Sequence, residues 1–174
     1  DVAPSRGLGD VYKRQVLNTI IVLLIALFSH TLPAVVVFIA VFMGLRQFVG
    51  GFHANSHLSC MFTLVMVMMV FSYGICNVSG HITPIFSISF IMIALPIILC
   101  IAPVPHPNKP MSEEKSVKLR KRSCILAVTL SVVTIALLVF QYQKLSLYVS
   151  SGMLLSAIMA LLGHFLNRGD NSKR

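Results

Sequence analysis

A short polar stretch between two long apolar runs, RQFVGGFHANSHLSC at residues 46–60, contains the groups best suited to chemistry. Within it, His53 precedes Cys60 by seven residues. An imidazole can take the proton of a thiol, and the resulting thiolate is a nucleophile that attacks carbonyl carbons. These residue types therefore suggest nucleophilic catalysis by a Cys–His pair.

The spacing of the pair requires a bend in the chain. On one unbroken α-helix, seven residues separate two side chains by about 10 Å, too far for a hydrogen bond. Two helix breakers, Gly50 and Gly51, precede His53, and two helix-capping residues, Asn55 and Ser56, lie between His53 and Cys60. The glycines can end the preceding helix, and Asn55 or Ser56 can cap the next. We expect His53 to fold back toward Cys60 in an early helical turn, where the thiol pKa falls below about 8.5.

A zinc site is the competing interpretation, because His53, His57 and Cys60 all carry zinc-binding atoms. Hydrolytic zinc sites usually have a carboxylate base nearby, and this stretch contains no Asp or Glu. The same absence favours a dyad over a triad, with Gln47, Asn55 or a backbone carbonyl orienting the imidazole. The N–H groups of Cys60 or of the glycine turn are candidate oxyanion donors. No metal or other cofactor is expected.

The remaining cysteines, Cys76, Cys100 and Cys124, stand singly in or beside apolar runs and form no C-x-x-C pair. This pattern argues against a disulfide framework or a zinc ribbon. Single cysteines of this kind are most often small packing residues. Cys124 follows the cations Lys121 and Arg122 and is the second candidate nucleophile.

The rest of the sequence is strongly apolar: 56% of the 174 residues are hydrophobic, 11% are charged, and the mean hydropathy is +0.87. Soluble domains average about a quarter charged residues. Between residues 16 and 166, charges occur only at Arg46, within 109–122 and at Lys144. Such uncharged runs are typical of transmembrane helices. The sequence predicts an all-α, polytopic transmembrane bundle, surrounded by membrane lipids and with no nucleic-acid partner.

Six apolar segments can be drawn, at about 16–29, 33–48, 58–78, 82–102, 124–140 and 145–166. The turns expected between neighbouring segments lie at 30–32, 79–81 and 141–144. Residues 1–15 are polar and end in DVYKRQ, which looks like a translated sequencing-library adapter. We expect them to be a non-native leader in place of the natural N-terminus. Residues 16–166 then form the membrane domain, and 167–174 a polar cytoplasmic tail.

Loop 103–123 carries six Lys or Arg residues against Glu113 and Glu114. Because cytoplasmic loops are enriched in Lys and Arg, this loop, the 46–60 gap and the tail are predicted to be cytoplasmic. The prolines of APVPHPNKP favour extended backbone, and Ser112 can cap a short basic helix, KSVKLRKR, that leads into the fifth span. The basic residues would contact anionic lipid headgroups or dock an acidic peptide.

Two motifs resemble the accessory gene regulator protein B (AgrB) family. The first, R-x-x-x-G-G-x-H-A with a cysteine seven residues after the histidine, is matched by Arg46, Gly50, Gly51, His53, Ala54 and Cys60. The second, an APxxxPNKP loop, is matched by Ala102, Pro103, Pro107, Asn108, Lys109 and Pro110. The resemblance covers roughly residues 16–166, and the family's amphipathic N-terminal segment has no counterpart here.

The resemblance implies a multi-pass cysteine endopeptidase of the bacterial cell membrane. Such an enzyme cuts an AgrD-like quorum-sensing propeptide, retains the N-terminal part as a thioester and promotes closure of a thiolactone ring. The nucleophile is then Cys60 and the base His53. Gly50, Gly51 and Asn55 would support the loop, and an acidic substrate tail would be held by cations: Arg46, Lys109, Lys118, Arg120, Lys121 and Arg122. Whether the enzyme forms a homodimer is not decided by the sequence.

A non-enzymatic transporter or scaffold is the remaining alternative, in which the 46–60 gap is a re-entrant hinge. Its weakness is the scarcity of charges inside the membrane segments, which argues against a proton-coupled carrier. Processing of the propeptide by the intact chain, and its loss in His53 and Cys60 variants, would separate the two classes.

The predicted orientation can be tested by labelling two engineered cysteines, Gly80→Cys and Ser112→Cys, with a membrane-impermeant thiol reagent applied from outside. Position 80 should react and position 112 should not, because the basic loop is expected in the cytoplasm. Reaction at position 112 alone would reverse the topology.

Overall fold

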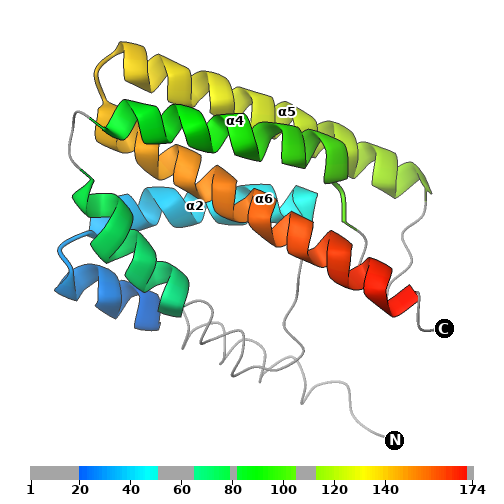
Figure 1. Cartoon of the computed structure of the whole chain (residues 1–174), viewed down its shortest axis with the longest axis horizontal. Helices are drawn as coiled ribbons and strands as arrows, with labels where there is room; N and C mark the ends of the chain where they lie inside the picture. Colours follow the sequence, from blue (N-terminus) through cyan, green and yellow to red (C-terminus); the bar gives the residue numbers. More distant parts are fainter. Residues whose placement is uncertain (1–19, 51–64, 79–81, 105–112, 172–174) are drawn as a thin grey trace, which may run out of the picture. The chain divides into compact units, whose positions relative to one another are not determined.

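The computed structural model describes residues 20–50, 65–78, 82–104 and 113–171 (Figure 1). Nearly all of these residues are helical: 20–28, α2 (Leu32–Val49), Val65–Asn77, α4 (Thr83–Ile101), α5 (Glu113–Val139) and α6 (Gln143–Asn171). Four helices in the described ranges are long and apolar enough to cross a membrane, within α2, α4, α5 and α6. The predicted all-α membrane fold is confirmed.

The chain divides into two compact units, and α2 runs from the first into the second. The first comprises Asp1–Val35 and Ala54–Asn77, and the second comprises Val36–His53 and Val78–Arg174. The second unit contains both ends of the chain segment that joins α4 to α5, and it also contains the end of α2. It therefore contains the described residues that bear on the start of the candidate loop.

In the first unit, the helix at 20–28 ends in a turn at His30, which has φ 55°. The Thr31 hydroxyl contacts Ser29 at 2.7 Å and donates to Ser72 at 3.2 Å. That second bond joins the turn to the helix Val65–Asn77. Hydroxyl pairs of this kind hold apolar helices together where water is scarce.

The helix Val65–Asn77 departs from the regular span that the sequence predicts over 58–78. A π-helical turn occupies Val70–Gly74, and a 3-10 turn follows at Ile75–Asn77. The Asn77 amide donates to the Tyr73 carbonyl at 2.9 Å and so occupies a backbone acceptor in this irregular stretch. Residues 58–64 and the turn expected at 79–81 lie outside the described part of the chain.

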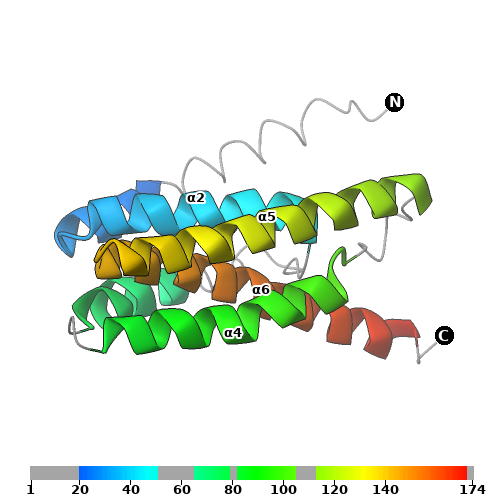
Figure 2. The same ribbon diagram turned by 90° about the horizontal axis from the view of Figure 1, so that it is seen from above.

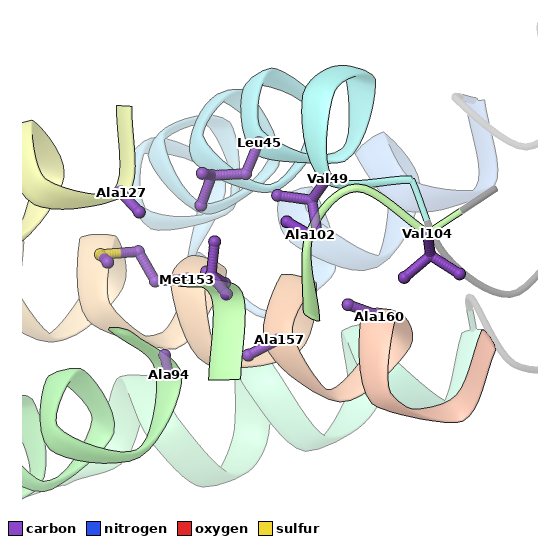
Figure 3. Close-up of a cluster of buried hydrophobic side chains, with 10 residues drawn as sticks. Leu45, Val49, Ala94, Ala102, Val104, Ala127, Met153, Ala157 and Ala160 are labelled. Atoms are coloured by element: carbon purple, nitrogen blue, oxygen red, sulfur yellow. The ribbon is translucent and has the colours of Figure 1, made fainter. Parts of the chain in front are cut away.

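In the second unit, α6 is the central helix and packs against both α4 and α5 (Figures 1 and 2). Just over half of its apolar stretch is buried, 56% against 22% for those of α4 and α5. The core is built from small and branched side chains, most of them labelled in Figure 3: Leu45, Val49, Ala94, Ile98, Ala102, Val104, Ala127, Met153, Ala157 and Ala160. Small residues let apolar helices approach closely inside a membrane.

Polar side chains also join the helices of this unit. Ser87 of α4 and Ser146 of α6 are both buried and lie 3.1 Å apart at their hydroxyl oxygens. Each hydroxyl also lies within hydrogen-bond distance of a carbonyl of its own helix, so its single proton has an acceptor within the protein. The turn before α6 contains Gln141 at φ 66°, which agrees with the short connection predicted there.

The basic segment is helical and continuous with the span that follows it. α5 starts at Glu113 and runs for 27 residues, so KSVKLRKR is its first part rather than a separate short helix. Good helix formers such as Lys, Arg and Leu fill this segment, and no Gly or Pro interrupts it. Ser112, the predicted cap, lies outside the described residues.

α2 and α6 come close together at Gly152. A β-carbon placed there would lie 3.0 Å from the Phe38 carbonyl oxygen and 3.0 Å from a Val41 methyl group. Ser156, one turn further along α6, donates to the Gly152 carbonyl at 3.0 Å, and its hydroxyl oxygen also lies 3.5 Å from the Phe42 carbonyl of α2. Gly152, Ser156 and Ala160 thus form a small-residue face spaced by four residues.

Gly152→Val should destabilise the protein by about 1–3 kcal/mol, because the added isopropyl group would overpack this contact. The midpoint of unfolding in an SDS titration, followed by circular dichroism, measures the change. Gly44→Val is the matched control, since a β-carbon at Gly44 meets nothing within 4 Å. Equal midpoints for the two variants would mean that the close approach of α2 to α6 is not needed for stability.

Candidate functional site

The predicted dyad itself, His53 with Cys60, lies outside the described residues. The same holds for five other residues considered for this site or for zinc binding: Gly51, Asn55, Ser56, His57 and Lys109. Their roles stay predictions. The structure does describe the point from which the loop starts, the chain segment beside that point, and the basic residues of α5.

α2 ends at Val49, immediately before the glycine pair. The Gly50 N–H donates to the Arg46 carbonyl at 3.1 Å, and Gly50 has φ +73°. Glycine in this left-handed conformation is the commonest way to end a helix, because other residues pay a steric penalty there. The Gly50 N–H is therefore engaged with Arg46, and of the predicted oxyanion donors the N–H groups of Gly51 and Cys60 lie outside the described residues.

The chain leaving α4 passes alongside the end of α2. After Ala102, whose N–H still donates to the Ile98 carbonyl at 3.0 Å, the Val104 N–H donates to the Val49 carbonyl at 2.9 Å. Gly50 and Val104 pair as an isolated parallel β-bridge. The two segments meet at the edge of the buried cluster, as Figure 3 shows for Val49, Ala102 and Val104.

This contact is dry and tightly packed. Val49, Ala102 and Val104 are 0%, 3% and 6% exposed. The Val104 carbonyl oxygen would lie 2.6 Å from a β-carbon placed on Gly50, closer than real side chains come. Glycine is thus required at position 50 for two separate reasons, its backbone angle and its neighbour.

Val104 is the residue that sequence reasoning missed. It occupies a variable position inside the APxxxPNKP motif, and a valine among prolines carries no chemical signal of its own. Its role is made by a backbone N–H, which every residue except proline possesses. The motif residues Ala102 and Pro103 on its N-terminal side were the available clue.

Arg46 lies one helical turn before Gly50, and its side chain is half-buried. Its guanidinium carbon sits 5.5 Å from the centre of the Phe42 ring, within the range of a cation–π contact. The structure therefore places the positive charge of Arg46 close to the root of the predicted catalytic loop.

The first part of α5 carries several exposed basic residues. Lys118 forms an ion pair with Glu114 at 2.6 Å, with side chains 68% and 80% exposed. Arg120, Lys121 and Arg122 are exposed and consecutive, so they point to different sides of the helix, about 100° apart. Among the α5 cations whose side chains the structure describes, Lys118 is the one with an ion pair.

The described cysteines give the second candidate nucleophile little support. Cys124 is half-buried and lies well inside α5. It is therefore not in the first turn of the helix, which is the part where a helix dipole favours a thiolate. Cys100 is exposed at the end of α4, and Cys76 is half-buried in the 3-10 turn. Within the described ranges, no group of three or more His, Cys, Asp and Glu residues is arranged to hold a metal ion.

A comparison with known families gives one match, to accessory gene regulator B, over residues 10–160. No curated protein and no solved structure matches the chain significantly. The family match spans most of the sequence and includes both motifs, which meet in the structure where Val104 pairs with Gly50. The chain therefore belongs to the accessory gene regulator B (AgrB) family and, with its four long apolar helices, is a membrane protein of the accessory gene regulator quorum-sensing system.

Proposed function

We propose that the protein is a membrane-embedded cysteine endopeptidase that cleaves an AgrD-like propeptide, with Cys60 as nucleophile and His53 as general base. The observation that carries this proposal is the family match over a sequence that has His53 within the R-x-x-x-G-G-x-H-A motif and Cys60 seven residues after that histidine. The geometry at Gly50 adds support, because it ends α2 three residues before His53 and lets the chain turn there.

In the first step, His53 takes the proton of the Cys60 thiol, and the thiolate attacks the carbonyl carbon of the scissile peptide bond. A carbon–sulfur bond forms as the carbonyl electron pair moves to oxygen. Collapse of this tetrahedral intermediate breaks the carbon–nitrogen bond. His53 then returns the proton to the leaving amine, and the acidic C-terminal tail departs.

In the second step, a cysteine thiol of the retained peptide attacks the acyl-enzyme thioester. One thioester replaces another, so the exchange is nearly balanced in energy, whereas direct conversion of an amide to a thiolactone would run uphill. The Cys60 thiol is regenerated and the peptide leaves as a ring. Exclusion of water by a membrane-edge site protects the intermediate from hydrolysis.

The basic residues give the acidic tail a place to bind. Arg46 stands beside the loop root, and Arg120, Lys121 and Arg122 supply exposed positive charge at the start of α5. Lys109 would add to this set, while the charge of Lys118 is offset by Glu114. Charge complementarity of this kind steers and orients a partner more than it tightens binding. We place these residues and the catalytic loop on the cytoplasmic side.

Cys60→Ala and His53→Ala should each abolish cleavage of a tagged propeptide coexpressed in the same cell, since each removes one half of the dyad. Immunoblotting for the shortened propeptide measures cleavage, and the amount of membrane-inserted protein is measured in parallel. Cys124→Ala is the matched control and should still cleave. Normal processing by Cys60→Ala protein would rule the proposal out.

A thioester intermediate has its own signature. A propeptide whose ring-forming cysteine is changed to alanine cannot complete the second step, so a covalent conjugate with the enzyme should accumulate and should be released by hydroxylamine. Absence of that conjugate, together with loss of activity in His57→Ala protein and in the presence of a chelator, would favour the zinc alternative.

The proposed role of the basic residues predicts a selective change in KM. Arg120→Gln, Lys121→Gln and Arg122→Gln should each raise KM for the propeptide about two- to fivefold at low salt, with kcat little changed, because each removes one exposed charge. The effect should shrink as salt screens the charges. Lys144→Gln is the control, because Lys144 is exposed at the other end of the hairpin formed by α5 and α6. An equal effect of Lys144→Gln would argue for a general loss of charge instead.

A further inference from the structure

We infer that the segment Ala102–Val104 is a positioning element for the catalytic loop: the Val104 backbone fixes the end of α2 and so sets where the chain carrying His53 begins. This inference rests on the proposed function. The APxxxPNKP motif would then position the R-x-x-x-G-G-x-H-A motif, in addition to any contact that it makes with the substrate.

The hydrogen bond from Val104 acts on a group that α2 cannot satisfy by itself. The last four carbonyls of a helix have no partner within the helix, and Val49 is the last residue of α2. The Val104 N–H supplies that partner at 2.9 Å. Because both residues are buried, water does not compete for the carbonyl, and the bond holds the helix end in one place.

Gly50 transmits the placement to the loop. Its φ of +73° turns the chain out of the helix, and its lack of a side chain lets the Val104 carbonyl approach to within 2.6 Å of the β-carbon position. Any side chain at position 50 would push the two segments apart or change the angle at which the chain leaves α2. Gly44, in the same helix, has no such neighbour within 4 Å.

His53 is three residues beyond this anchor. Three residues of chain reach at most about 11 Å, so the position of Gly50 limits where the imidazole can be. Proton transfer from a thiol needs a hydrogen-bond distance, and a displacement of about 1 Å costs on the order of 10²-fold in rate. The anchor is suited to this task because Val49 and Val104 belong to the buried cluster of the second unit.

The test compares Gly50→Ala with its matched control, Gly44→Ala, in full-length protein whose other cysteines, Cys76, Cys100 and Cys124, are changed to alanine. Gly50→Ala should lower kcat for propeptide cleavage on the order of 10²-fold while KM changes by less than about twofold. The pH midpoint for alkylation of Cys60 by iodoacetamide should also rise toward that of a free thiol, about 8.5. Gly44→Ala should change neither quantity. Identical kcat values and midpoints for the two variants would overturn the inference.

A second pair of variants isolates the N–H group. Val104→Pro removes the donor, whereas Val104→Ala keeps it and only shortens the side chain. At a temperature where circular dichroism shows both folded, kcat of the alanine variant should exceed that of the proline variant by about tenfold or more. Equal kcat values would show that the N–H does not position the loop.

The Cys60→Ala protein, assayed alongside, separates this inference from the proposed function. Cleavage that persists in Cys60→Ala protein removes the proposed function itself. Cleavage that is lost in Cys60→Ala protein but unchanged in Gly50→Ala protein leaves the function standing and removes the positioning role alone.

Discussion

The hydrogen bond from the Val104 N–H to the Val49 carbonyl joins the end of one membrane helix to the chain that leaves another. It lies among fully buried side chains, where an unpaired carbonyl or amide would cost about 1–3 kcal/mol. The requirement to pair these groups draws the two segments together. Gly50 then has to be glycine, because the pairing brings the Val104 carbonyl against it.

The packing of the helices in the second unit supports the contact between Val49 and Val104. α6 lies in the middle, and its small residues, such as Gly152 and Ala157, let α2 and α4 come close to it. Both helices therefore end near one another. A bulkier core would move those ends apart before any catalytic residue were changed, so the stability of the bundle and the geometry of the loop depend on the same small side chains.

The sequence was a good guide to the membrane helices, because hydrophobic runs, charge clusters and turn residues act over short distances along the chain. The glycine pair marked the end of α2, and Gln141 lay in the turn before α6. The π-helical turn at Val70–Gly74 was missed, since no residue type in VFSYG dictates a wider helical pitch.

For the candidate site, the sequence indicated the types of residue but not their support. His53 and Cys60 stood out by their chemistry and spacing, and their mutual geometry stays a prediction because neither lies in the described ranges. Val104 could not be found in this way. Its contribution is a backbone donor brought close by packing between segments more than 50 residues apart, which no local pattern encodes.

The continuity of α5 has a consequence for where a peptide can be held. A helix of 27 residues is about 40 Å long, whereas the hydrocarbon layer of a bilayer is about 30 Å thick. About two turns must project beyond it, and the sequence puts Arg120, Lys121 and Arg122 near that boundary. The continuous helix then holds these cations at the depth of the lipid headgroups, which is the depth at which a peptide lying flat on the membrane surface would bind.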